Sequence, residues 1–119
     1  QIYQKSKPDV TGRVTVPVLW DKQTEHIVSN ESSEIIRMFN SAFDAITGNR
    51  LDFWPVARRN AIEMTNDDIY QHINNGVYRA GFATKAPAYD EAVTDLFDAL
   101  DRIEARLGEN RYLLGDDIT

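Results

Sequence analysis

Glu31 and Ser32 combine residue types that can bind a small ligand carrying both charges. They follow a short apolar stretch and stand where a helix should begin, so backbone N–H groups there point beyond the helix end. This arrangement suits a carboxylate; Ser32 adds a hydroxyl donor, and Glu31 can pair with an ammonium group. A ligand with a free α-amine and an α-carboxylate would satisfy both residues. The alternative is ordinary helix capping, which accounts for most such residues at helix starts.

Pro17 is unusual because it interrupts a segment rich in β-branched residues, 13–20, that otherwise reads as a strand. Proline has no N–H for a sheet, so it belongs on an edge strand or at a special bend. A cis bond before Pro17 would turn the backbone of Val16 outward. The N–H and C=O of Val16 would then be able to pair with an extended peptide. The alternative is an edge-strand proline without a ligand.

Tyr78 is the third candidate, with Tyr70 and Arg79 close to it in the sequence. A tyrosine hydroxyl can donate a hydrogen bond to a phenolic substrate or accept one from it. The alternative is a tyrosine half-buried between helices with its hydroxyl in water. His26 and His72 have no partner at ligand spacing, so the sequence predicts no metal site.

The composition excludes several classes of function. The 119 residues are 42% hydrophobic and 27% charged, as in globular proteins. The net charge is −6 and there is no basic run, so nucleic-acid binding is not expected. No apolar stretch reaches the roughly 18 residues of a membrane span, and no signal peptide is evident, so we expect a cytoplasmic protein without membrane contact. The absence of cysteine excludes disulfides and a thiol nucleophile within these residues.

The elements that must position the candidates change in type along the sequence. Residues 1–12 read as a loop, and the segment 13–20 forms a hairpin with a short return strand at 26–28. Apolar residues at helical spacing then predict a helix over 32–47, which Gly48 ends. The first part of the sequence is therefore mixed α and β.

The later part of the sequence is predicted to be helical throughout. A capping-box-like start at 65–68 precedes one helix that ends near Gly81. A second helix begins at the Ala-Pro pair 86–87 and ends at Gly108. The sequence therefore predicts an α+β fold with three parts, which are a mixed domain at 1–47, a linker at 48–59 and an all-α domain at 60–119.

We expect this sequence to be a piece of a longer protein. It begins with Gln1, and Thr119 beside an acidic turn is typical of the first residue of a helix. A two-stranded hairpin does not form a stable sheet alone, so further strands should come from upstream or from a partner. Such a piece should expose strand edges and an open apolar helix face.

Four segments together resemble one known family. They are VPVLWDK (16–22), IVSNESSEIIRMFN (27–40), INNGVYRAGFAT (73–84) and YLLGD (112–116). The family is that of the glutathionyl-hydroquinone reductases, the Xi class of the glutathione transferase superfamily. The resemblance implies the later half of a thioredoxin-like, glutathione-binding domain, followed by the first helices of an all-α domain. The implied activity is glutathione-dependent reduction of glutathionyl-hydroquinones to hydroquinones, with release of glutathione disulfide.

The resemblance also assigns roles to the candidate residues. It implies that Val16, before a cis Pro17, pairs with the cysteinyl backbone of glutathione. Glu31 and Ser32 would hold the γ-glutamyl amine and carboxylate. Tyr78 matches a family tyrosine that contacts the aromatic substrate. The implied ligands are thus glutathione as co-substrate and an aromatic hydroquinone conjugate, with no metal, and the full-length protein is expected to be a homodimer.

One departure from the family pattern affects the chemistry. The family nucleophile is a cysteine in a Cys-Pro-Trp-Ala type motif upstream of this strand, and this sequence has no cysteine. We therefore expect no catalytic residue among the 119 and no activity from them alone. The main alternative is a non-catalytic binding module with a glutathione transferase-like fold. A transferase that uses a hydroxyl in place of the thiol is a further possibility, but no residue here is in the right place, because that nucleophile would also lie upstream.

Overall fold

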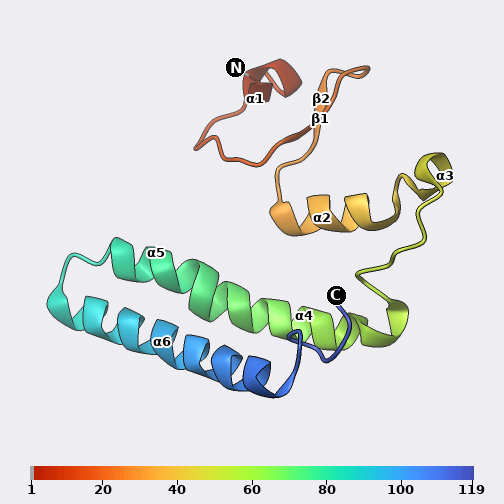
Figure 1. Cartoon of the computed structure of the whole chain (residues 1–119). Helices are drawn as coiled ribbons and strands as arrows, with labels where there is room; N and C mark the ends of the chain where they lie inside the picture. The colour runs from red at the N-terminus through yellow and green to blue at the C-terminus, as the bar shows by residue number, and fades with distance from the viewer. Residues whose placement is uncertain (1) are drawn as a thin grey trace. The chain divides into compact units, whose positions relative to one another are not determined.

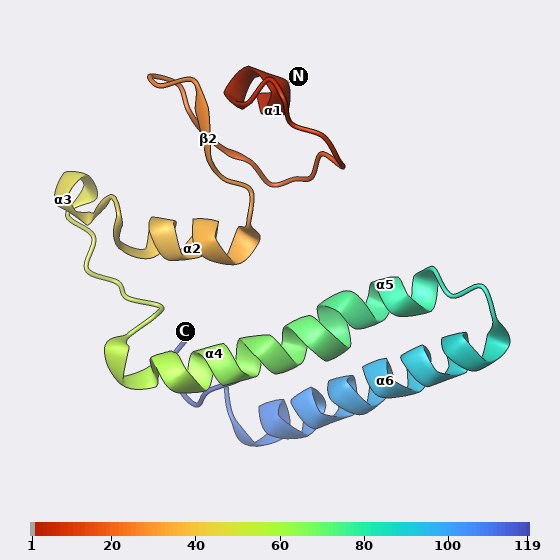
Figure 2. The same ribbon diagram turned by 180° about the vertical axis from the view of Figure 1, so that it is seen from behind.

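The computed structural model describes residues 2–119 and divides into two compact units, of which the first ends at Asp52 and the second begins at Phe53 (Figure 1). The first unit contains a short hairpin and short helices, and the second is helical (Figure 2). This is the α+β composition that the sequence predicts.

The first unit is built from five short elements. They are the helix α1 (Ile2–Ser6), the strands β1 (Leu19–Asp21) and β2 (His26–Ser29), and the helices α2 (Ser32–Ser41) and α3 (Asp44–Thr47). The strands pair antiparallel, with Trp20 opposite Ile27 and an irregularity between Leu19 and Trp20. The hairpin is therefore present but shorter than the sequence indicates.

The turn of the hairpin is organised by Asp21. Its Oδ1 accepts hydrogen bonds from the N–H of Gln23 at 2.7 Å and the N–H of Thr24 at 3.2 Å. The bond from Gln23, followed by those from Thr24, lowers the pKa of the Asp21 carboxyl from its ordinary value, because these donors favour the charged form. This is the turn chemistry by which aspartate side chains mimic backbone.

Three expectations for the first unit are wrong. Residues 2–6 are helical and not loop, because tertiary contacts hold this single helical turn in place. The strand predicted over 13–20 is limited to Leu19–Asp21 in β1. The helix predicted over 32–47 is interrupted after Ser41, where α2 ends and α3 follows. The prediction for Gly48 is confirmed, since its φ of 68° is left-handed and its N–H donates to the C=O of Asp44 at 2.8 Å.

The second unit is a pair of antiparallel helical rods (Figure 1). The first rod runs without a break through three elements after a short turn, and the second is a single helix. The elements are η1 (Val56–Arg58), α4 (Arg59–Asp68), the π-helical segment η2 (Ile69–Asn74), α5 (Asn75–Gly81) and α6 (Ala86–Glu109).

The helix start predicted at 65–68 is wrong, because α4 begins at Arg59 and runs through this segment. The polar residues of this segment therefore lie along the side of the rod and not at its end. The other boundaries are confirmed: α5 ends at Gly81, and α6 begins at Ala86 with Pro87 in its first turn, where its missing N–H has no partner to lose. Gly108 lies in the last turn of α6.

The two rods pack through small and branched side chains. Ala92, Leu96 and Ala99 of α6 are buried, as is Ile62 of α4. Gly76 of α5 is buried against α6, and a Cβ there would lie 3.5 Å from Leu96 Cδ1, which is an ordinary van der Waals distance. The rods are therefore in close contact at Gly76.

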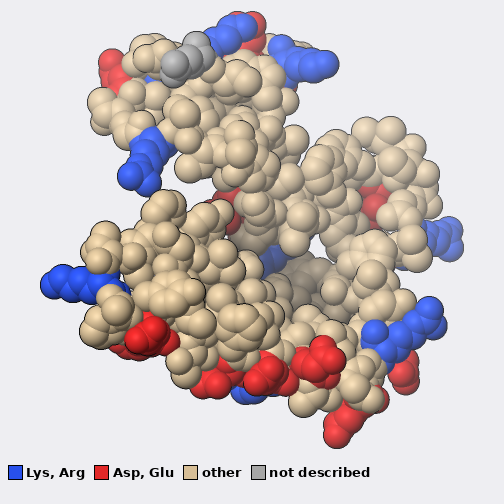
Figure 3. Space-filling model, turned by 60° about the vertical axis from the view of Figure 1, so that its left-hand side comes forward, with Lys and Arg blue, Asp and Glu red and all other residues tan. Residues whose placement is uncertain are grey.

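Many apolar side chains of both units are exposed, as expected of a sequence with an open helix face. In the first unit they include Ile36, Phe39, Phe43 and Ile46, and in the second they include Val77, Tyr78, Phe82 and Phe97. None of the helices in residues 2–119 combines the length and apolar character that a membrane span needs. In Figure 3, acidic side chains gather along the lower margin, and side chains of both signs occur elsewhere on this face.

Truncating the central contact of the helix pair should destabilise the second unit. We expect Leu96→Ala to lower the free energy of unfolding by roughly 2–3 kcal/mol, because it removes buried methyl groups and leaves a cavity beside Gly76. Leu107→Ala, on the exposed part of the same helix, is the matched control and should cost less than about 1 kcal/mol. Urea unfolding followed by circular dichroism measures both, and equal losses would contradict this view of the core.

Candidate functional site

Thr15 links the two segments that the sequence singles out in the first unit. Asn30, which precedes Glu31, donates from Nδ2 to Thr15 Oγ1 at 3.2 Å. On its other side, the hydroxyl of Tyr3 donates to the C=O of Thr15 at 2.8 Å and lies 3.2 Å from Thr15 Oγ1. Thr15 precedes Val16, so this network brings the Val16-Pro17 segment next to the start of α2.

The helix α1 holds the neighbouring hairpin as well. The N–H of Ile27 in β2 donates to Ser6 Oγ at 3.0 Å, and Lys5 pairs with Glu25 in the turn. The N-terminal turn of helix therefore contacts both the segment before Pro17 and the strand before α2. The polar side chains of α1 therefore hold the segments of the candidate site in place without belonging to the site.

The peptide bond between Val16 and Pro17 is cis. Val16 is 88% exposed, and no residue from 2 to 119 forms a hydrogen bond with its backbone N–H or C=O. Both backbone groups are thus open to a ligand. Neither residue belongs to β1, so the segment beside α2 is a loop and not the strand that the sequence predicts.

Glu31 is the N-cap residue of α2, and its backbone is extended, with φ −104° and ψ 117°. Its C=O accepts from the N–H of Ile35 at 3.0 Å, and its own N–H donates to Ser29 Oγ at 3.1 Å. Its side chain makes no capping hydrogen bond. The capping alternative therefore does not account for the Glu31 carboxylate, which is exposed at the helix start.

Ser32 is the first residue of α2, and its hydroxyl is also exposed. Within the described residues 2–119, neither this hydroxyl nor the Glu31 carboxylate has a hydrogen-bond partner. The N–H groups of the first helical turn point in the same direction, since the first turn of a helix leaves its donors unpaired. A carboxylate acceptor, a hydroxyl and free N–H groups thus meet at one helix end.

Tyr78 lies on α5, in the second unit. It is 65% exposed, and its ring is stacked on that of Phe82 with centroids 6.2 Å apart and planes 8° from parallel. The half-buried alternative for Tyr78 is therefore wrong. Phe82 is not among the residues predicted from the sequence, although its spacing of four residues from Tyr78 on a helix is the signal that would have found it.

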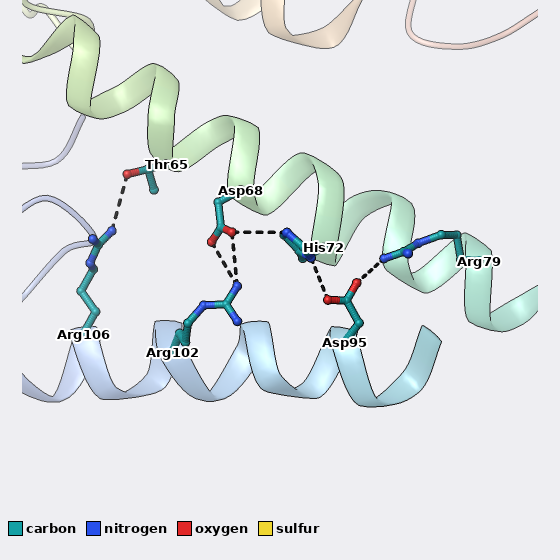
Figure 4. Close-up of polar contacts among 7 residues, drawn as sticks. All are labelled: Thr65, Asp68, His72, Arg79, Asp95, Arg102 and Arg106. Atoms are coloured by element: carbon teal, nitrogen blue, oxygen red, sulfur yellow. Dashed lines mark hydrogen bonds and ion pairs between the residues drawn. The ribbon is translucent and has the colours of Figure 1, made fainter. Parts of the chain in front are cut away.

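The rods of the second unit are also joined by a polar network (Figure 4). His72 is not isolated as the sequence suggested, because its Nδ1 lies 2.8 Å from Asp95 Oδ1 and its Nε2 lies 3.7 Å from Asp68 Oδ1. Each carboxylate also binds an arginine. Asp95 pairs with Arg79, and Asp68 Oδ1 lies 3.2 Å from Arg102 Nη2. The carboxylates are thus occupied by arginine, and no cluster in residues 2–119 has the makeup of a metal site.

Comparison with known proteins decides the family. No family model matches the sequence. The sequence is 55% identical over its whole length to glutathionyl-hydroquinone reductase YqjG of Escherichia coli, and 49% identical to glutathionyl-hydroquinone reductase PcpF of Sphingobium chlorophenolicum. The structure matches the glutathione-bound structure of YqjG with a TM-score of 0.95 and 54% identity, covering 99% of this chain and 38% of that one.

A solved structure carries the class name itself. The structure of glutathione S-transferase Xi from Phanerochaete chrysosporium matches with a TM-score of 0.93 and 51% identity, over 99% of this chain and 41% of that one. The chain belongs to the Xi-class glutathione transferases. It spans 36% of the length of YqjG and 38% of PcpF.

Within this Xi-class chain, the residues that support the site were not predicted from the sequence. Tyr3, Thr15 and Asn30 are far apart in sequence and common in type, and no local pattern marks them. Their role follows only from the hydrogen bonds that join α1, the Pro17 segment and the start of α2. In contrast, Glu31 and Ser32 are marked by their position at the start of a predicted helix, and Pro17 is marked by its position inside a predicted strand.

The ion pairs of Asp95 with Arg79 and His72 should make the stability of this Xi-class chain depend on pH at acidic pH values. The hydrogen bond from Arg79, followed by that from His72, lowers the pKa of the Asp95 carboxyl from its ordinary value of 3.8. A carboxyl with a lowered pKa in the folded state stabilises the fold above its unfolded pKa, and this contribution is lost as the pH falls through the folded pKa. We therefore expect Asp95→Asn to lower the free energy of unfolding at about pH 5. The difference from the original chain should shrink as the pH falls toward about 2.

Urea unfolding at the two pH values measures this difference. Asp98→Asn is the matched control, since Asp98 lies on the same helix and forms no ion pair within residues 2–119. The control should show little change in stability relative to the original chain at either pH. A loss from Asp95→Asn that persists unchanged at the lower pH would contradict the assignment.

Proposed function

We propose that this chain supplies glutathione-binding residues and part of the aromatic-substrate site of a glutathione-dependent enzyme that reduces glutathionyl-hydroquinones to hydroquinones. The observation that carries the proposal is the hydrogen-bonded link from Thr15 to Asn30, which brings the open backbone of Val16 next to the start of α2. The backbone and helix end together match the chemistry of a γ-glutamyl peptide.

Two parts of glutathione have a counterpart in this arrangement. The γ-glutamyl ammonium pairs with the Glu31 carboxylate, and the γ-glutamyl α-carboxylate accepts from the Ser32 hydroxyl and the N–H groups of the first turn of α2. The cysteinyl backbone pairs with the N–H and C=O of Val16 beside Pro17, as an added strand would. Tyr78 supplies an aromatic ring and a hydroxyl for the second substrate.

The relatives support this reading. YqjG and PcpF bear the name glutathionyl-hydroquinone reductase. Glutathione is bound in the solved structure of YqjG and in one of the Xi glutathione transferase ECM4 of Saccharomyces cerevisiae. Homodimer formation and a cytoplasmic location are part of the same proposal.

The reaction needs a thiol that these residues do not contain. A thiolate attacks the sulfur of the conjugate, the bond from sulfur to the ring carbon breaks, and that carbon takes up a proton. A second glutathione then displaces the first thiolate from the mixed disulfide and leaves as glutathione disulfide. Because the chain has no cysteine, the attacking thiolate comes from outside these 119 residues, and the chain by itself should be inactive.

The Glu31 assignment is tested by a ligand that lacks the group Glu31 would bind. Isothermal titration of the 119-residue chain with glutathione should show binding, and Glu31→Gln should weaken it roughly tenfold by removing a charge-assisted hydrogen bond. Glutaryl-cysteinylglycine, which is glutathione without its α-amine, should bind the original chain more weakly. Its affinity should not change in Glu31→Gln, because the missing amine and the missing charge remove the same contact.

Glu34→Gln is the matched control on the same helix. Glu34 forms an exposed ion pair with Arg37 at 3.0 Å, so its replacement should change the affinity for glutathione little. Equal effects from Glu31→Gln and Glu34→Gln would refute the assignment. Absence of any glutathione binding by the folded chain would favour the other hypothesis, a non-catalytic binding module.

A further inference from the structure

The helix α5 has one face against α6 and another that is open. Gly76 lies against Leu96 of α6. At about 100° per residue, Tyr78 and Phe82 follow roughly 200° and 240° farther around the helix, on the side away from Gly76. Their exposed fractions of 65% and 78% agree with this placement. Two large aromatic rings therefore stand in the open on the same side of α5.

The rings form an ordered pair and are not independently exposed. Their planes are 8° from parallel and their centroids 6.2 Å apart. The backbone fixes the spacing between the residues, because the N–H of Phe82 donates to the C=O of Tyr78 at 3.0 Å. Phe97 is also exposed in the second unit, but no ring lies against it within residues 2–119.

We propose that Phe82 is a further specificity-determining residue, whose ring forms with Tyr78 a platform that stacks the aromatic ring of the second substrate. This inference rests on the proposed function, from which it takes the ligand class. Because the two planes are parallel, a flat ring stacked on the face of one is parallel to the other as well. The Tyr78 hydroxyl is free within residues 2–119 to bind a phenolic hydroxyl of the ligand.

The geometry favours an aromatic ligand over an aliphatic one of the same size. Aromatic rings prefer offset parallel or edge-to-face arrangements, and stacking adds to the gain from burying apolar surface. A puckered aliphatic ring meets an aromatic face only through its C–H groups and gains no ring-to-ring stacking. Phe82, which is apolar, selects for the flat ring, and Tyr78 adds a polar contact at its rim.

The test compares a flat ligand with a puckered one. Benzene-1,4-diol, titrated into the 119-residue chain, should shift the NMR signals of the Tyr78 and Phe82 rings in a saturable way, and cyclohexane-1,4-diol should not. Phe82→Leu should weaken benzenediol binding roughly three- to tenfold, whereas Phe82→Tyr, which keeps the ring, should retain it. Phe97→Leu is the matched control and should have no effect.

Glutathione titration of the same variants separates this inference from the proposed function. Phe82→Leu should bind glutathione as the original chain does, because the glutathione residues lie in the first unit and Phe82 lies in the second. An unchanged circular dichroism spectrum shows that the helices of the second unit are folded in the variant. Normal glutathione binding with benzenediol binding that is absent, or unaffected by Phe82→Leu, would overturn the platform and leave the proposed function intact. If the original chain does not bind glutathione but shows a saturable benzenediol shift at Phe82, the proposed function is overturned and the aromatic platform is kept. Equal binding of the two diols, or shifts at Phe82 caused only by self-association, would also overturn it.

Discussion

The hydrogen bonds at Thr15 are the interaction on which the candidate glutathione site depends. Thr15 is bound from one side by Tyr3 of α1 and from the other by Asn30, next to the start of α2. Neither Pro17 nor Glu31 lies in a long regular element, so no extensive ladder of backbone hydrogen bonds holds them together. The three hydrogen bonds are exposed, so water competes with each of them, but together they are the contacts that join the two segments at Thr15.

The second unit depends instead on apolar packing between two rods. The ion pairs of Figure 4 are exposed or partly exposed, and pairs in such positions typically contribute little to stability. The contact of Gly76 with Leu96 and the buried side chains of α6 hold α5 against α6. The network at His72 adds hydrogen bonds between the rods. Helical periodicity places Tyr78 and Phe82 on the side of α5 away from Gly76.

Local sequence signals predicted a useful part of the fold. The periodic apolar residues of α6 and the punctuation by Gly48, Gly81 and Pro87 predicted the element ends correctly, because these residues act through backbone geometry that is independent of distant contacts. Where the signal was tertiary, the predictions failed. The helix α1 is a single turn with little intrinsic stability, and the polar run 65–68 resembles a helix start although it lies within the long rod.

The sequence by itself determined the family, the α+β composition and the residue types of the candidate site. It did so because Glu31, Ser32 and Pro17 stand at positions where local backbone chemistry is already constrained, and because the motifs around them are specific. Only the tertiary structure decided that Tyr3 and Asn30 join two of these segments at Thr15, and that Phe82 lies parallel to Tyr78. The physical reason is that hydrogen bonds over 12 and 15 residues, and the open side of a packed helix, depend on contacts that no local pattern encodes.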